Sequence, residues 1–195
     1  MNLRFLSLSG AQAGPVIDGL AALRIRVFRD WPYLYDGDAA YERAYLLVYA
    51  DNPRAVIAAA FDGETLVGAA TGLPMADADP EFAAAFAGSG HDLSQIFYCA
   101  ESVLLPAYRG QGAGHRFFDL RETHARALGL RFAAFCSVVR PADHPARPAA
   151  YTPLDGFWRK RGYTPLKGIV AQFHWRDVGE DAETAKSLQF WMKQL

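Results

Sequence analysis

A glycine-rich segment just past the middle of the chain most constrains how this sequence can fold. Arg109-Gly110-Gln111-Gly112-Ala113-Gly114 follows the apolar run Val103–Pro106 and precedes a helical pattern of apolar residues that begins at Phe117. This order predicts a strand, a tight turn and the N-terminus of a helix. Glycines let backbone N–H groups approach a ligand closely, and a helix N-terminus adds unpaired donors with a partial positive charge. The segment is therefore a candidate phosphate or pyrophosphate site, to which Arg109 adds a fixed charge.

Two common phosphate motifs do not fit this segment. A P-loop requires a Lys-Ser or Lys-Thr pair after the glycines, and none follows Gly114. A dinucleotide-binding turn requires the spacing G-x-G-x-x-G close to the first strand, whereas this segment has G-x-G-x-G past mid-chain. A nucleotide-binding module is therefore disfavoured.

The spacing that fits is R-x-x-G-x-G, which resembles the acyl-CoA pyrophosphate loop of the GCN5-related N-acetyltransferase (GNAT) superfamily. The preceding Leu105-Pro106-Ala107-Tyr108 is similar to the strand exit of that family, and Phe157–Tyr163 is similar to its F-Y-x-K-x-G-F element. The two blocks stand in the family's order, with a strand candidate at Phe132–Val139 between them. The segment at Trp31–Asp36 also resembles a poorly characterised bacterial subgroup, which implies no known acceptor.

Composition and patterning predict one domain over residues 1–195, with 51% hydrophobic residues and ample length for a core. Val16, Leu20, Leu23 and Val27 share one face of the first helix, which Arg24 is expected to avoid. The expected strands are Leu3–Leu8, Val56–Phe61, Leu66–Gly72, Ile96–Leu105, Phe132–Val139, Tyr163–Leu166 and Ile169–Trp175. The expected helices are Val16–Arg29, one capped by Asp38, a short one at Pro80–Ala87, Gly114–Leu128, Asp155–Arg161 and a closing helix at Ala182–Leu195.

The resemblance implies an α/β (α+β) acyl-CoA acyltransferase fold, in which a mixed central sheet with splayed strands is flanked by helices. It also implies acetyl-CoA as co-substrate, lying in the gap between the splayed strands. The resemblance implies that the backbone groups of Val103, Leu104 and Leu105 bind its pantetheine arm. The residues that the resemblance implies for binding its pyrophosphate are Arg109, Gly110, Gln111, Gly112, Ala113 and Gly114.

Acyl transfer to an amine requires a base that removes a proton from the ammonium. Glu101 is the leading candidate, because it lies in an otherwise apolar strand just before the stretch expected to contact pantetheine. The sequence does not fix the register of this strand, so Tyr98 is the alternative to Glu101 as the side chain that faces the pocket. Tyr151 is the candidate general acid, with Tyr163 as an alternative and unassisted thiolate departure as another. Many family members have a tyrosine where this chain has Trp158.

The segment Trp31–Asp36 is the candidate acceptor wall. Tyr33, Tyr35 and Asp36 would suit a cationic or aromatic amine through cation–π contact and ion pairing. The alternative is that these aromatic residues fill the core beneath a bend. A second candidate wall is the proline-rich loop at 141–153, where His144, with Arg140 and Arg147, would suit an anionic acceptor.

Composition also limits the partners. The net charge of −1 argues against nucleic acid or an anionic membrane surface, and no run reaches the ~18 apolar residues of a membrane span. No signal peptide is expected, and Cys99 and Cys136 lie in strand-like runs, as in a reduced cytoplasmic protein. No cysteine and histidine spacing suggests zinc or another metal site. We expect a small-molecule or peptide amine as substrate, and a homodimer is compatible with this composition. The alternative is a non-catalytic acyl-CoA-binding or regulatory domain.

Overall fold

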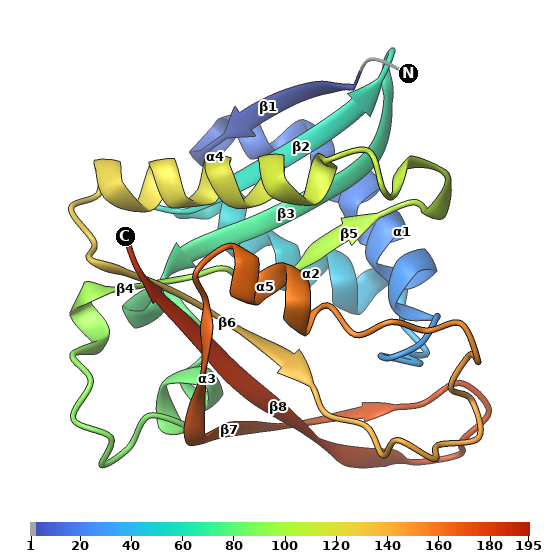
Figure 1. Ribbon diagram of the computed structural model, residues 1–195. Coiled ribbons are helices and arrows are strands. Elements are labelled where there is room, and N and C mark those ends of the chain that lie inside the picture. The colour runs from blue at the N-terminus through green and yellow to red at the C-terminus, as the bar shows by residue number, and fades with distance from the viewer. Residues whose placement is uncertain (1–2) are drawn as a thin grey trace.

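A mixed sheet of eight strands with helices on both faces forms the part of the chain described by this computed structural model, residues 3–195 (Figure 1). The strands are β1 (Arg4–Leu8), β2 (Val56–Asp62), β3 (Thr65–Pro74), β4 (Ile96–Tyr98), β5 (Ser102–Leu104), β6 (Phe132–Val138), β7 (Thr164–Arg176) and β8 (Glu183–Gln194). The helices are α1 (Ile17–Phe28), α2 (Ala39–Asp51), α3 (Pro80–Ala84), α4 (Ala113–Ala127) and α5 (Asp155–Lys160). The sheet order is β1-β2-β3-β4-β6-β8-β7, and β5 pairs with β3.

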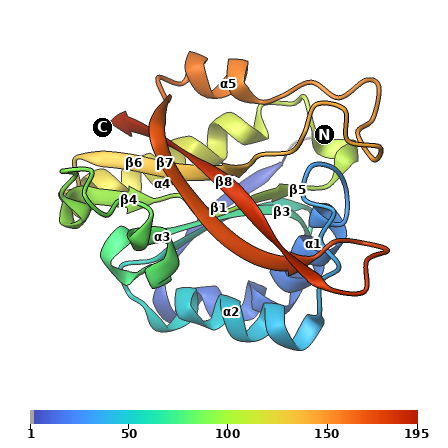
Figure 2. The same cartoon turned by 90° about the horizontal axis from the view of Figure 1, so that it is seen from below.

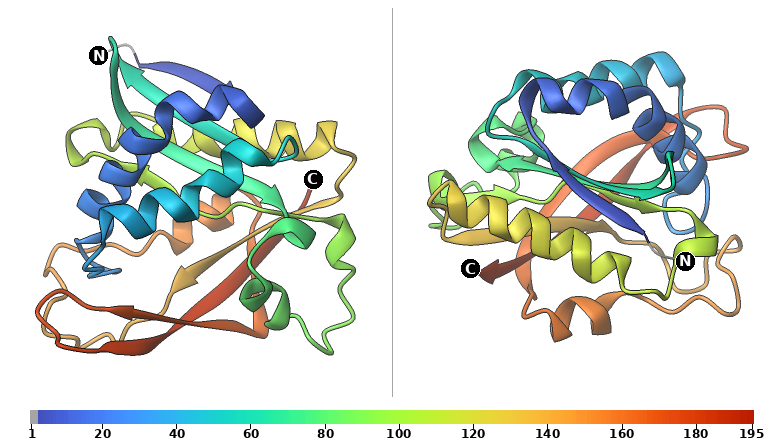
Figure 3. Two further views of the ribbon diagram at one scale, coloured as in Figure 1. Left: turned by 180° about the vertical axis from the view of Figure 1, so that it is seen from behind. Right: turned by 90° about the horizontal axis from the view of Figure 1, so that it is seen from above.

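The helices form two layers, one on each face of the sheet (Figure 2). Helices α4 and α5 lie on one face, and α1 and α2 cross the β1–β3 half on the other face (Figure 3). Strand β2 is buried on both sides because its centre is the alanine run Ala58-Ala59-Ala60, whose small side chains leave room for a helix layer on either face. The expected fold class, a mixed sheet flanked by helices, is confirmed.

A β-bulge interrupts the expected strand Ile96–Leu105 and divides it into β4 and β5. Thr71 of β3 faces two residues there, because its carbonyl accepts from the Ala100 N–H at 3.1 Å and its N–H donates to the Glu101 carbonyl at 3.1 Å. Strict alternation along a strand would turn Glu101 toward α4. The inserted residue instead places Ala100 and Glu101 on the same face as Tyr98. The bulge therefore decides which helix layer receives the glutamate.

The chain ends in a strand, so the expected closing helix at Ala182–Leu195 is wrong. Its apolar residues Leu188, Trp191, Met192 and Leu195 have helical spacing, but β8 pairs along its length with β6 on one side and β7 on the other. Backbone pairing to a free sheet edge outweighs the local pattern here. The expected strands on either side of Lys167 also join into β7, with a register shift between Pro165 and Val170.

The expected cap at Asp38 is confirmed, and a glycine makes the hairpin turn after β2. The Asp38 carboxylate accepts from the Tyr41 N–H at 2.9 Å and caps α2. Gly63, with φ of 58°, makes the turn between β2 and β3. Among the described helices, none combines the length and apolar composition that a transmembrane span requires.

Gly68→Ala is expected to destabilise the protein by about 1–3 kcal/mol through overpacking. A Cβ at Gly68 would lie 2.9 Å from the Val103 carbonyl oxygen and 2.5 Å from the Leu104 side chain, so β3 and β5 would have to separate. Gly156→Ala is the control, because a Cβ at that helical position meets nothing within 4 Å. Urea unfolding of both variants measures the difference, and equal midpoints would show that β3 and β5 are not closely packed.

Candidate functional site

The glycine-rich segment forms the turn that enters α4. Gly110 and Gly112 have φ of 76° and 85°, which L side chains rarely adopt, and Gly112 is the N-cap of α4 with no side-chain cap among the described residues. The first N–H groups of the helix therefore keep their donors free for a ligand. The Gln111 side chain instead folds back and donates to the Ala107 carbonyl at 3.1 Å. The turn thus has the features of an anion site.

Strands β5 and β6 diverge beyond the bulge (Figure 1). The pairing between β4 and β6 covers Ile96–Tyr98 against Phe132–Ala134, and the Cys99 N–H donates to the Ala134 carbonyl at 2.7 Å. Strand β5 pairs with β3 only, so its other edge is free of strand partners in the described sheet. The splay leaves a backbone edge on which an extended ligand arm can pair.

The register corrects which backbone groups lie on that free edge. The Leu105 N–H donates to the Val67 carbonyl at 3.0 Å and the Glu101 carbonyl accepts from Thr71. In an antiparallel ladder alternate residues bond the same neighbour, so Val103 also bonds toward β3. The backbone groups of Ser102 and Leu104 face the gap instead. The orientation needed for the predicted pantetheine contact is therefore present at Leu104 and absent at Val103 and Leu105. Ser102 has it too, which the sequence does not reveal because it depends on the position of the bulge.

Glu101 begins this edge and points toward α1 and α2. Its carboxylate is 5% exposed, and Oε2 lies 2.8 Å from Arg24 Nη1. The Tyr45 hydroxyl donates to the same oxygen at 3.4 Å. The other oxygen, Oε1, is buried and has no hydrogen-bond partner among residues 3–195. The site therefore holds a desolvated carboxylate with one acceptor position unused.

Arg24 lies on the buried face of α1, contrary to expectation, and pairs with two carboxylates. Besides Glu101 it bonds Glu42 of α2, and its guanidinium stacks over the Tyr45 ring at 4.5 Å. Burial opposes its charge, but Glu101, Tyr45 and Glu42 outweigh burial and raise the pKa of Arg24, so it stays protonated. One cation between two buried carboxylates leaves a net negative charge. The four-residue spacing from Leu20 is the signal that places Arg24 on this face.

Tyr98 lies on the α1 and α2 face together with Glu101, so the bulge removes the choice between the two side chains that strict alternation would impose. Its hydroxyl lies 3.2 Å from the Cys136 Sγ of β6, and its ring packs on Phe82. Burial raises the pKa of the Cys136 thiol to about 12, and burial followed by Cys136 raises the pKa of Tyr98. Both groups are therefore neutral near pH 7.

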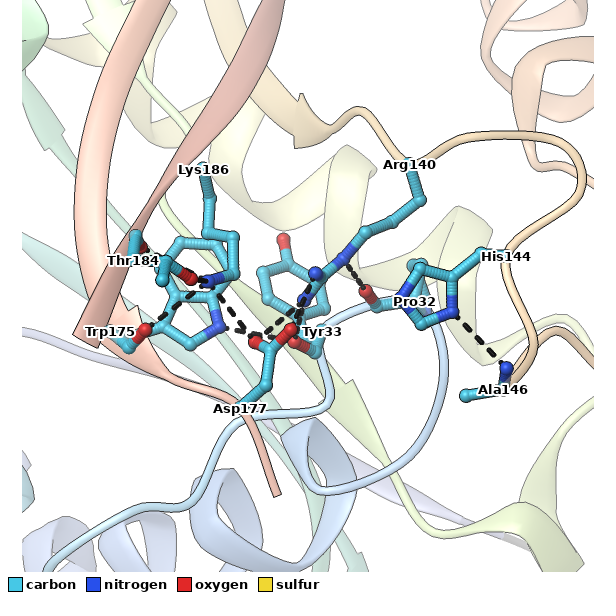
Figure 4. A network of polar contacts seen from close by, with 9 residues as sticks. All are labelled: Pro32, Tyr33, Arg140, His144, Ala146, Trp175, Asp177, Thr184 and Lys186. Atoms are coloured by element: carbon cyan, nitrogen blue, oxygen red, sulfur yellow. Dashed lines mark hydrogen bonds and ion pairs between the residues drawn. The ribbon is translucent and has the colours of Figure 1, made fainter. Parts of the chain in front are cut away.

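Arg140, at the end of β6, ties the segment 31–36 to the β7–β8 hairpin (Figure 4). It donates to the carbonyls of Pro32 and Tyr33 and forms two bonds to Asp177, at 2.7 and 2.9 Å. Trp175 Nε1 donates to the same Tyr33 carbonyl at 3.1 Å. This network fixes the backbone of the predicted acceptor wall.

The side chains of that wall divide between packing and surface pairing. The Tyr33 ring packs at a tilt against Phe28, with centroids 4.4 Å apart, and burial is the main cause that raises the pKa of Tyr33. Burial and the neighbouring Glu42 likewise raise the pKa of Tyr35. Tyr33 and Tyr35 thus pack against the core, as expected from the alternative interpretation that these aromatic residues fill the core beneath a bend.

Asp36 does not lie free in the pocket. Arg29 approaches its carboxylate at 3.1 Å and Arg176 at 2.7 Å, so two arginines already neutralise it. A cationic ligand would have to displace them. The expectation that Asp36 is the counter-charge of an amine is therefore corrected.

The tyrosines considered as general acid lie in different places. Tyr151, in the loop before α5, packs edge-on against Trp31 at 5.8 Å, and burial, followed by Asp155, raises its pKa. Tyr163 is fully buried on the α4 face, where its hydroxyl donates to Glu122 at 3.1 Å. The Trp158 ring packs against Trp191. Tyr163 is therefore excluded as the acid, and Tyr151 lies beside the 31–36 segment.

His144 lies in the same loop as Tyr151 and also packs against Trp31. Its ring lies 5.1 Å from that of Trp31, and its Nδ1 accepts from the Ala146 N–H at 3.2 Å (Figure 4). Arg140, engaged with Asp177, is not free for an anionic acceptor. The loop therefore covers the 31–36 segment rather than forming a basic site around Arg140.

Comparison with known proteins agrees with this geometry. The model of the acetyltransferase (GNAT) family matches residues 21–154. No curated protein matches the chain in sequence. A GCN5-related N-acetyltransferase from Kribbella flavida is similar in structure, with a TM-score of 0.59 and 15% identity over 99% of this chain and 98% of that chain. A Salmonella typhimurium protein with its cofactor acetyl-CoA has a TM-score of 0.56 and 14% identity over 100% of this chain and 93% of that chain. An aminoglycoside 6′-N-acetyltransferase complexed with coenzyme A has a TM-score of 0.60 and 18% identity over 97% of this chain and 96% of that chain.

Asp177→Asn is expected to lower the free energy of unfolding at pH 7 by about 1.5–3 kcal/mol, because Arg140 and Lys186 lose a charged partner. Burial alone would raise the pKa of Asp177, but Arg140 and then Lys186 lower it below its ordinary 3.8. The stabilisation is therefore full above that value and is lost as the pH falls through the folded-state pKa.

The difference between wild type and Asp177→Asn should accordingly shrink in acid, as measured by urea unfolding between pH 7 and pH 3. Asp181→Asn is the control, because this exposed residue lies in the same hairpin and should change stability by less than about 0.5 kcal/mol. A pH-independent difference would contradict the charge-pair assignment.

Proposed function

The chain belongs to the acetyltransferase (GNAT) family, and from this premise we propose that it transfers an acetyl group from acetyl-CoA to the amine of a small molecule or peptide. One observation carries the proposal. The buried carboxylate of Glu101 stands where β4 leaves β6, at the start of the free edge that leads to the glycine turn. A base and a binding edge for an acyl donor therefore meet at one point of the sheet.

The residues around the splay fit acetyl-CoA as co-substrate. Gly110, Gly112 and Gly114 present N–H donors without a Cβ to block them, which suits the pyrophosphate. The backbone groups of Ser102 and the Leu104 N–H, which face away from β3, suit the amides of the pantetheine arm. Arg109 donates through Nε to the Leu104 carbonyl at 3.2 Å, which links the two parts of the site.

Direct transfer then requires proton transfers and bond changes. Glu101 accepts a proton from the ammonium of the acceptor, so that the nitrogen lone pair is free. The nitrogen attacks the thioester carbonyl, a C–N bond forms and the C–S bond breaks. The departing thiolate takes a proton from Tyr151, which we propose as donor because its raised pKa keeps it protonated at neutral pH. The acylated nitrogen gives its second proton to the Tyr151 phenolate, which leaves a neutral amide and restores the tyrosine. Holding both substrates at the splay supplies proximity.

The remaining residues of the proposed acceptor side are aromatic. Tyr33 and Tyr98 lie on the face to which Glu101 points, and Tyr35 lies beside Glu42. The alternative function, acyl-CoA binding without transfer, is favoured by Trp158 standing at the tyrosine position. It predicts acetyl-CoA binding with no CoA release in the presence of any amine, which a thiol assay on an amine library tests.

Glu101→Gln is expected to lower kcat by ~10²-fold or more, because the amide cannot accept the ammonium proton, while acetyl-CoA affinity stays unchanged. The loss should diminish as the pH rises and free amine becomes available. Steady-state CoA release over a pH series measures both effects. Glu122→Gln is the control, because Glu122 is equally buried but bonds Arg161 and Lys193 on the opposite face. A wild-type rate for Glu101→Gln would clear Glu101 of the role.

Gly112→Val is expected to weaken acetyl-CoA binding more than tenfold, about 1.4 kcal/mol, because a side chain at φ of 85° would obstruct the N–H donors of the turn. Calorimetric titration with acetyl-CoA measures the affinity. The matched control is Gly129→Val, at φ of 76° beyond the other end of α4, which suffers the same backbone strain far from the turn. Equal affinities for the two variants would contradict the pyrophosphate assignment.

A further inference from the structure

A hollow of about 290 Å³ opens between α2 and the segment 75–82, on the same face of the sheet as Glu101. Its walls include the aromatic side chains of Tyr45, Tyr49, Phe82 and Tyr98. The volume lies at the small end of ligand pockets, which suits a compact molecule rather than a peptide chain. Tyr98 is the one residue that the hollow shares with the acceptor side described above, and no residue of the segment 31–36 lines it.

The inner wall of the hollow touches the candidate base. Tyr45 lines the hollow, and its hydroxyl donates to Glu101 Oε2 at 3.4 Å. The Tyr49 hydroxyl, also on the wall, lies 3.5 Å from that of Tyr45. Only the Tyr45 side chain therefore separates a molecule bound against these two tyrosines from the Glu101 carboxylate that we propose as base.

The electrostatics on this side favour a cation. Arg24 neutralises only one of the two carboxylates of Glu42 and Glu101, and each glutamate retains a buried Oε1 with no partner in residues 3–195. At the mouth, Arg54 and Asn52 bond Asp77, and Asp79 caps α3, so the rim is acidic but already structured. The uncompensated charge therefore lies behind Tyr45, beyond the inner end of the hollow, and its potential favours an ammonium group at that end.

The walls add a preference for an apolar or aromatic body. The Phe82 and Tyr98 rings pack with centroids 4.4 Å apart, and those of Tyr45 and Tyr49 lie 6.2 Å apart. The faces and edges of such rings accommodate both a cation and an apolar chain. A neutral polar ligand would gain from neither feature.

We propose that this hollow is the acceptor channel, and that the acceptor is a compact primary alkylammonium with an aromatic or short apolar body. This inference rests on the proposed function, because it identifies the substrate class of the same reaction. The ammonium enters past Val48, and its body lies among the four aromatic walls. Its charge lies against the Tyr45 hydroxyl, on the other side of which is the Arg24 cluster, which we define as Arg24, Glu42 and Glu101.

The test blocks the mouth of the hollow without touching the site. Val48 is 39% exposed and lines the hollow, whereas its neighbour Leu47 is 42% exposed and does not. With 2-phenylethylamine as the probe amine, Val48→Trp should raise the KM for the amine at least tenfold and leave the KM for acetyl-CoA unchanged. Leu47→Trp should leave both constants unchanged. Equal KM values for the two tryptophan variants would overturn the proposal.

A charge pair at the same position tests the preference for a cation. Val48→Lys should raise the KM for 2-phenylethylamine and Val48→Glu should lower it, with both effects weakening in salt. Calorimetry gives a readout independent of turnover, in which 2-phenylethylamine should bind and its neutral analogue 2-phenylethanol should not. Binding of the two with equal affinity would overturn the substrate class.

Failure of this inference is distinguishable from failure of the proposed function. If other amines are acetylated but 2-phenylethylamine neither binds nor reacts, the channel assignment fails and the proposed function stands. If no amine in the library releases CoA while acetyl-CoA binds, the proposed function fails. In that case calorimetric binding of 2-phenylethylamine that Val48→Trp abolishes would still support the hollow as an amine site, and unaffected binding would overturn it.

Discussion

The site depends on how Arg121 of α4 holds the bulge. Arg121 is 1% exposed, and among the described residues no carboxylate forms an ion pair with it. Its Nη1 donates to the carbonyls of Thr71 and Glu101, at 3.2 and 3.1 Å, and its Nε donates to Phe117. A buried guanidinium needs such acceptors because its desolvation is costly. By bonding both sides of the bulge, Arg121 holds together the point from which the rest of the site follows.

Three consequences follow from that one irregularity. The strand stops pairing with β6 and continues on β3 alone, so a gap opens for an extended ligand. The extra residue turns Glu101 to the α1 and α2 face, where Arg24 meets it. It also shifts the parity of β5, so the free backbone edge belongs to Ser102 and Leu104. The positions of the base, the gap and the binding edge are therefore coupled, and moving the bulge by one residue would separate them.

The opposite side of the site is held by buried ions from distant parts of the chain. Arg140 and Lys186 share Asp177, and Arg140 also bonds the backbone at 32–33, which fixes the position of the segment 31–36 (Figure 4). Arg24 links α1 to α2 and to the bulge. Breaking such pairs is costly because the remaining charge stays buried. Asp36 is likewise unavailable to a ligand, because Arg29 and Arg176 both pair with it.

The sequence by itself determined the features that depend on neighbouring residues. The glycine turn before α4, the Asp38 cap, the Gly63 hairpin and the family all follow from short patterns, because their geometry is set by local backbone preferences. Only the tertiary structure decided the features that depend on distant partners. The closing segment became β8 because β6 offered an unpaired edge. The partners of Arg24 and Asp36, and the face on which Glu101 lies, were decided by packing between segments whose contacts no local pattern encodes.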